Sequence, residues 1–87
     1  MIRTLIVDDE PYAREELAEL LGSDPDIEII GSAANAIEAL SLIARLKPEV
    51  VFLDIQMPKL SGMELVAMLD PLPRIVFVTA FDEYAIQ

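Results

Sequence analysis

Short apolar runs alternate with segments of helical periodicity along this chain, and this alternation limits the fold more than any other feature. Strands are expected at the apolar runs, residues 3–8, 27–30, 50–54 and 75–78. Helices are expected where apolar residues recur at spacings of three and four, at 11–21, 36–46, 62–69 and from 83 onwards. Right-handed crossovers between such strands predict a parallel, doubly wound α/β sheet with helices on both faces.

Proline and glycine residues indicate where these elements are expected to begin and end. Pro11 suits a first helical position, and Gly22 is expected just beyond the end of that helix as its C′ residue. Pro48 should end the second helix at Lys47. Glu28 inside the second strand predicts an edge position or a wetter face, and residues 31–35 are expected to form the next connection.

Composition excludes several classes of function. The 87 residues form one small domain at most, and they include no cysteine or histidine, so thiolate or imidazole metal sites and histidine acid–base chemistry are excluded. The net charge of −10 argues against direct nucleic-acid binding and fits a hard cation or a basic partner. No apolar stretch approaches membrane-spanning length and no secretion signal is visible, so a cytoplasmic protein is expected.

Polar residues end three of the expected strands. Asp8 and Asp9 follow the first, Asp54 ends the third, and Thr79 follows the fourth. The winding reverses between the first and third strands, which places these acids around one crevice. Carboxylates within about 4–5 Å repel by several kcal/mol per pair at an effective dielectric near 20, so some are protonated or a cation lies among them.

An all-oxygen set favours Mg²⁺. A carboxylate beside this ion can attack a phosphoryl group, and a hydroxyl can bind one of the transferring oxygens. The simpler alternative is that these acids only solvate loops or cap helices. That alternative is strongest for Asp9 taken alone, and it is weak for the whole combination.

The chain resembles the receiver domain of two-component response regulators. Four segments in order carry the resemblance: Leu5-Ile6-Val7-Asp8-Asp9-Glu10, Val51-Phe52-Leu53-Asp54-Ile55-Gln56-Met57-Pro58, Ser61-Gly62 and Val78-Thr79-Ala80. The segment from Thr79 to Ile86 is most similar to regulators with a LytTR-type DNA-binding domain. The resemblance implies a flavodoxin-like fold, with strand order 2-1-3-4 for the strands present.

The resemblance also implies roles for individual residues. Asp54 would be the phosphoacceptor for a histidine kinase, and Asp8, Asp9, Asp54 and the main-chain carbonyl of Gln56 would bind Mg²⁺. Thr79 would be the switch hydroxyl that contacts the phosphoryl group, and Ala80 would leave room for its approach. Pro58 and Gly62 would shape the loop after the acceptor, in a mainly structural role. A receiver is a phosphoacceptor domain that at most assists its own phosphorylation and dephosphorylation, so no enzyme is expected.

The resemblance further predicts that residues 1–87 are a single receiver domain, incomplete at its C-terminus. The family continues with a fifth strand ending in Lys-Pro and a last helix. The basic residues nearest the motifs, Lys47, Lys59 and Arg74, do not match that catalytic lysine. A DNA-binding output would lie in a missing C-terminal domain. The fourth strand would then form an uncharged edge, which favours self-association.

Two other functions remain open from the sequence. An aspartate-nucleophile phosphatase is expected to have a second acid two residues after the nucleophile, where this chain has Gln56. A phosphorylation-independent interaction module would fit a receiver that lacks its lysine. A dinucleotide-binding enzyme is excluded, since no glycine-rich turn follows the first strand.

Overall fold

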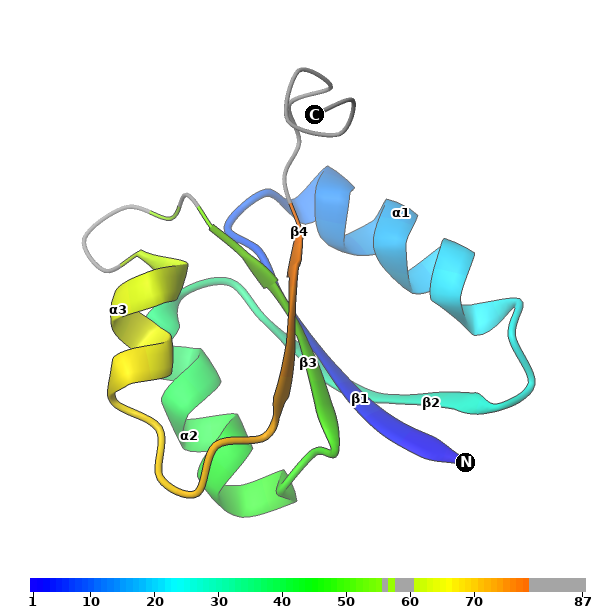
Figure 1. The fold of residues 1–87 in the computed structure, drawn as a ribbon. Coiled ribbons are helices and arrows are strands. Elements are labelled where there is room, and N and C mark those ends of the chain that lie inside the picture. Colours follow the sequence, from blue (N-terminus) through cyan, green and yellow to red (C-terminus); the bar gives the residue numbers. More distant parts are fainter. Residues whose placement is uncertain (56, 58–60, 79–87) are drawn as a thin grey trace.

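Four parallel strands form the centre of the molecule in a computed structural model that describes residues 1–55, 57 and 61–78 (Figure 1). The strands are β1 (Ile2–Val7), β2 (Ile27–Ala33), β3 (Val50–Asp54) and β4 (Arg74–Val78). Their order in the sheet is β2-β1-β3-β4. The predicted parallel, doubly wound architecture and its strand order are therefore confirmed.

Helices cover both faces of this sheet. Helix α1 (Pro11–Gly22) lies on one face, and α2 (Ala36–Leu46) and α3 (Gly62–Ala67) lie on the other (Figure 1). The chain goes from β1 to β2 on one side and then crosses back to β3 on the other side of β1. This reversal opens a crevice at the carboxyl ends of β1 and β3. None of the helices described is long and apolar enough to cross a membrane.

The core lies between the sheet and helices α2 and α3. Alternate strand residues point to one face of a sheet, and Leu5, Val7, Val51 and Leu53 are all at most 1% exposed on the face that α2 and α3 cover. Leu65 of α3 packs into the same cluster. β1 and β3 are central strands, and helices cover this face of them. The main chain at the carboxyl ends of these two strands is therefore held firmly in place.

Strand β2 is longer than its sequence predicts. Its pairing with β1 shifts between Thr4 and Leu5, so that Ile29 and Gly31 are partners of consecutive β1 residues and Ile30 is an extra residue. Beyond this bulge the pairing continues to Ala33. The predicted connection at residues 31–35 is therefore wrong for residues 31–33. Glu28 is exposed on what is an edge strand, as expected.

Two helix ends differ from the predictions. Gly22 is the last residue of α1, and Ser23 caps the helix with a right-handed φ of −76°, so Gly22 is not a left-handed C′ residue. Helix α3 ends at Ala67, because the N–H groups of Met68 and Leu69 turn to the carbonyls three residues before them. Lys47 does end α2, in the left-handed region with a φ of 49°. The helix predicted from residue 83 lies outside the described residues.

Helix α1 packs less tightly than its pattern suggests. None of its residues is buried, and Leu20 is 69% exposed, although its spacing of three from Leu17 is that of an inward helix face. In contrast α2 buries Ala36, Ala39 and Ile43. Within the described residues, α1 therefore contributes less to the buried core than α2 does.

Candidate metal centre

The register between β1 and β3 brings three carboxylates together. Val7 pairs with Leu53, so the next residues along the two strands, Asp8 and Asp54, are neighbours at the carboxyl ends. Asp8, Asp9 and Asp54 each offer one oxygen, and these oxygens all lie within 4.8 Å of one another. Asp9 is exposed and Asp54 is half-buried. The acids that the sequence singled out therefore form one cluster, contributed by two central strands.

Asp8 is held more firmly than its neighbours. It is 9% exposed, and its N–H donates to the carbonyl of Ala33 at the end of β2, at 3.1 Å. Its Oδ1 accepts the N–H of Glu10 at 2.9 Å, and its carbonyl accepts Nη1 of Arg14 at 2.8 Å. These contacts fix both main-chain polar groups of Asp8 and one carboxylate oxygen.

The donor set fits Mg²⁺. Three carboxylate oxygens form a hard, negatively charged site, and such a site prefers a hard cation. Oxygens on one Mg²⁺ are at most about 4.2 Å apart, because the metal–oxygen distance is about 2.1 Å. The 4.8 Å span of the cluster is slightly wider. A small inward movement, or a water between one carboxylate and the ion, would close that difference.

Strand β3 stays paired with β4 up to its last residue, Asp54. Asp54 pairs with Val78 of β4, and the N–H of Ile55 donates to the carbonyl of Val78 at 3.3 Å. The main chain around Asp54 is thus held by strands on both sides. Several other residues to which the sequence assigns a role lie outside the described residues: Gln56, Pro58, Thr79 and Ala80. Gly62 is the first residue of α3, and Ser61 directly before it is the N-cap of that helix.

Two residues near the cluster had no role in the sequence reasoning. Met57 is 7% exposed and belongs to the core cluster, although it lies after the end of β3. Arg14 contacts the main chain of Asp8. The sequence does contain a sign of a role for Arg14. A cation near the start of a helix interacts unfavourably with the helix dipole, which suggests that its side chain has a partner elsewhere.

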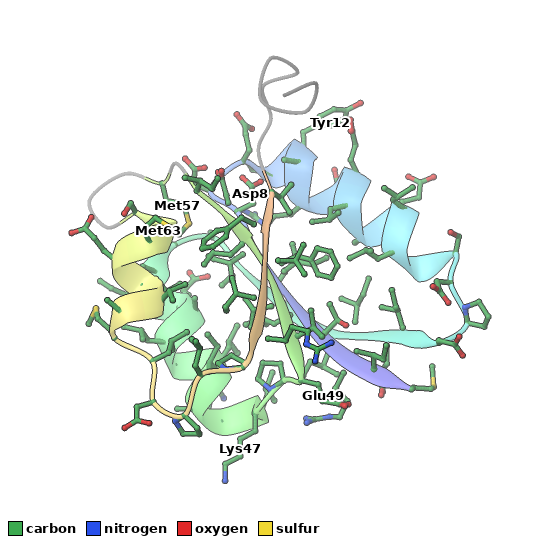
Figure 2. The ribbon with its side chains drawn as sticks, in the orientation of Figure 1. Asp8, Tyr12, Lys47, Glu49, Met57 and Met63 are labelled. Carbon is green, nitrogen blue, oxygen red and sulfur yellow. The ribbon has the colours of Figure 1, made fainter. Side chains whose placement is uncertain are left out.

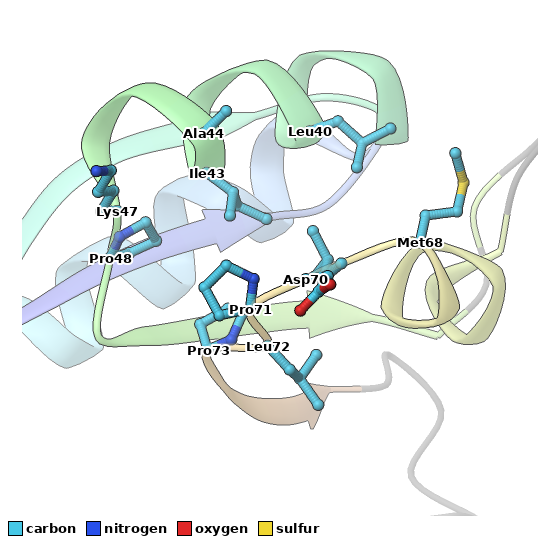
Figure 3. A pocket seen from close by; sticks show the side chains of 11 residues that line it. Leu40, Ile43, Ala44, Lys47, Pro48, Met68, Asp70, Pro71, Leu72 and Pro73 are labelled. Atoms are coloured by element: carbon cyan, nitrogen blue, oxygen red, sulfur yellow. The ribbon is translucent and has the colours of Figure 1, made fainter.

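A surface groove of about 580 Å³ lies beside the cluster. Asp8, Tyr12 and Val78 are among the residues that line it, and Figure 2 shows Asp8 and Tyr12 at the same end of the molecule. A cavity of about 540 Å³ lies at the opposite end of the sheet, between the last turn of α2 and the segment before β4 (Figure 3). Pro48, which lines it, lies before the start of β3, whereas Asp54 is at the end of that strand, so this cavity is remote from the carboxylate cluster.

Comparison with known proteins points to one family. Residues 4–87 match the model of the response regulator receiver domain. The chain is 67% identical to a response regulatory protein of Shewanella oneidensis, over 100% of this chain and 38% of that protein. It is 62% identical to the transcriptional regulatory protein BtsR of Salmonella typhi, over 100% of this chain and 37% of that protein. The chain thus spans well under half the length of these relatives.

Solved structures agree with the sequence relatives. The response regulator domain of Thermotoga maritima CheB is 35% identical, with a TM-score of 0.84, over 92% of this chain and 61% of that one. The receiver domain of the response regulator NarL from Mycobacterium tuberculosis is 33% identical, with a TM-score of 0.85, over 98% of this chain and 71% of that one. Both similarities extend over nearly all of the chain.

Proposed function

The chain belongs to the response regulator receiver domain family, and on this basis we propose that Asp54 accepts a phosphoryl group in the presence of Mg²⁺. The observation that carries the proposal is the convergence of Asp8, Asp9 and Asp54 within 4.8 Å at the ends of β1 and β3. Three acids from two strands are more than loop solvation or helix capping requires. Asp8 accepts the N–H of Glu10, the N-cap of α1, but a contact at that helix end does not account for Asp54, which comes from β3.

The proposed reaction uses Asp54 as a nucleophile. One carboxylate oxygen of Asp54 attacks the phosphorus, the bond from phosphorus to the nitrogen of the donor histidine breaks, and an acyl phosphate remains on the protein. When bound, Mg²⁺ would offset negative charge on the transferring oxygens. Asp8, Asp9 and the main-chain carbonyl of Gln56 are proposed to hold that ion.

The strand frame supports this role for Asp54. Leu53 directly before it is fully buried, and β4 pairs alongside it. Such a frame holds the attacking oxygen in place, and positioning is the main contribution a protein makes to phosphoryl transfer. Thr79 is proposed to bind the phosphoryl oxygens, and Ala80 to leave room for it. For these two residues the support is their place in the sequence directly after Val78.

Intact-protein mass spectrometry tests the proposal. Incubation with Mg²⁺ and the small phosphodonor acetyl phosphate should add one phosphoryl group to the 87-residue chain. Asp54→Asn should abolish the added mass, whereas Glu64→Gln, a control at an acid in the first turn of α3, should leave it intact. An adduct that persists in Asp54→Asn would refute the assignment of the acceptor.

Two alternative functions give different results in the same experiment. A phosphatase would turn over the donor continuously, with release of inorganic phosphate far above the protein concentration. A phosphorylation-independent interaction module would show no adduct in the presence of Mg²⁺. The absence of an acid two residues after Asp54, where Gln56 stands, favours a phosphoacceptor over a phosphatase, so we do not propose an enzyme.

The partners follow from the family and its named relatives. We propose a histidine kinase as phosphodonor, a cytoplasmic location, and control of transcription through a LytTR-type DNA-binding domain beyond these residues. The support for transcriptional control is the similarity to a transcriptional regulatory protein of which this chain covers only 37%. The support for the LytTR type is the sequence from Thr79 to Ile86. Expression of the longer protein and a DNA-binding assay with and without phosphodonor would test this output.

We also propose that the 87-residue chain associates with itself through β4. Within the part of the chain that the structure describes, β4 pairs with β3 on one side only. Its apolar residues Val76 and Phe77 are 38% and 41% exposed. After Arg74 the four residues of this edge strand are apolar, and such an exposed edge offers main-chain donors and acceptors to a second copy.

A further inference from the structure

A hydrogen-bonded support lies behind the carboxylates, and Arg14 of α1 is its central residue. Nη1 of Arg14 donates to the carbonyl of Asp8 at 2.8 Å, in a partly buried contact. The side chain crosses from the helix to the loop that carries Asp8 and Asp9. A charged donor makes a stronger hydrogen bond to a carbonyl than a neutral one does. Arg14 is therefore a strong tie between α1 and that loop.

The contact closes a short ring of hydrogen bonds. The N–H of Arg14 donates to the carbonyl of Glu10 at 3.0 Å, and the N–H of Glu10 donates to Oδ1 of Asp8 at 2.9 Å. The guanidinium then returns to the carbonyl of Asp8. Helix, loop and metal-binding acid thus hold one another in one arrangement. On its other side Asp8 is tied to Ala33 of β2.

Helix stability does not explain this arginine. Arg14 lies in the first turns of α1, where the positive end of the helix dipole disfavours a cation. It also adds a positive charge beside a site that would bind a divalent cation, and charge alone would weaken that binding. Arg14 can favour metal binding only by holding the loop of Asp8 and Asp9 in one conformation. Charge and ordering therefore predict opposite effects of removing Arg14.

We propose that Arg14 is a positioning residue for the metal site: it fixes the Asp8 carbonyl so that the Asp8 and Asp9 carboxylates face Asp54. The inference rests on the proposed function, since it concerns the same three acids. Loss of an outer partner of a metal ligand typically lowers metal affinity about 10-fold to 100-fold. The effect expected here is near the lower end, because Ala33 still holds Asp8.

Titration calorimetry with Mg²⁺ tests the proposal, with no phosphodonor present. Arg14→Met keeps the apolar stem and removes the donor and the charge, and it should bind Mg²⁺ about 10-fold more weakly than the parent chain. Arg14→Gln, with a shorter amide, should also bind more weakly. Arg14→Lys keeps one charged donor and should recover most of the affinity.

The matched control is Arg45→Met, which removes the same charge from an exposed position in the last turn of α2. It should leave Mg²⁺ affinity within about 2-fold of the parent, because exposed charges beyond the Debye length are screened. Circular dichroism without metal checks that each variant is folded. If Arg14→Met does not fold, Arg14→Gln supplies the same comparison.

The outcomes separate this inference from the proposed function. Equal or tighter Mg²⁺ binding by folded Arg14→Met or Arg14→Gln would overturn the positioning role and leave the metal site in place. A parent chain that binds no Mg²⁺ at millimolar concentration would overturn both the metal site and the inference. An adduct on Asp54 in that case would still support the phosphoacceptor.

Discussion

Arginine side chains act at both ends of β1, and at each end they bind main-chain carbonyls. Arg14 holds the loop after the strand. At the other end, the guanidinium of Arg3 donates to the carbonyls of Leu46 and Lys47, where α2 ends. The main chain of Arg3 also accepts the N–H of Glu49 at 2.8 Å. The last carbonyls of a helix have no partner within it, so Arg3 satisfies groups that Lys47, in its left-handed conformation, leaves open.

Substitution of Arg3 by methionine should destabilise the fold without affecting the metal site. Hydrogen bonds from a charged donor contribute about 1.5–3 kcal/mol each, and partial exposure reduces this to about 1–2 kcal/mol for the pair. Urea unfolding should give a lower midpoint with an unchanged slope. Arg45→Met is the control, and a midpoint for Arg3→Met equal to that of the control would contradict the role of Arg3.

At the scale of the elements, the two edges of the sheet differ. Edge strand β2 carries Glu28, and a bulge at Ile30 interrupts its regular pairing. Both features protect an edge from pairing with another chain. Edge strand β4 consists of Arg74 followed by four apolar residues. Edge β2 therefore has a charge and a bulge within it, whereas in the described residues the only charge of edge β4 is Arg74 at its start.

A lysine placed in β4 should reduce self-association of the 87-residue chain. Val76 is 38% exposed, and Val76→Lys introduces the charge that natural edge strands use against pairing. Sedimentation velocity at rising concentration should show less association for this variant. Val76→Thr, which keeps β propensity without a charge, should behave like the parent. A parent chain that is monomeric at high concentration would refute the prediction.

At the scale of the whole molecule, folding concentrates negative charge that the sequence distributes. The net charge is −10, and the fold brings Asp8, Asp9 and Asp54 from separate segments to one point. In the unfolded chain Asp54 is far from the adjacent pair Asp8 and Asp9. A cation that binds the cluster therefore binds the folded state alone and stabilises it.

Mg²⁺ should raise the melting temperature through this cluster. At ten times its dissociation constant the ion should stabilise the fold by about 1.4 kcal/mol, which is a rise of about 6–10 °C for a domain of this size. Asp9→Asn, at an exposed position, should remove most of the rise. KCl at equal ionic strength controls for general screening, and an equal rise in KCl would contradict a specific site.

The sequence by itself determined the architecture, because alternating apolar runs of strand and helix period leave few ways to bury them. It also identified the three acids, since the carboxyl ends of parallel strands meet at one edge. Only the tertiary structure decided features that depend on partners remote in sequence. Strand pairing extended β2 past Ile30 to Ala33, and α1 could keep Gly22 in the helix because its end needs no left-handed residue. The hydrogen bond from Arg14 to the Asp8 carbonyl is likewise tertiary: the sequence shows a cation in an unfavourable helix position, but it does not show which group that cation binds.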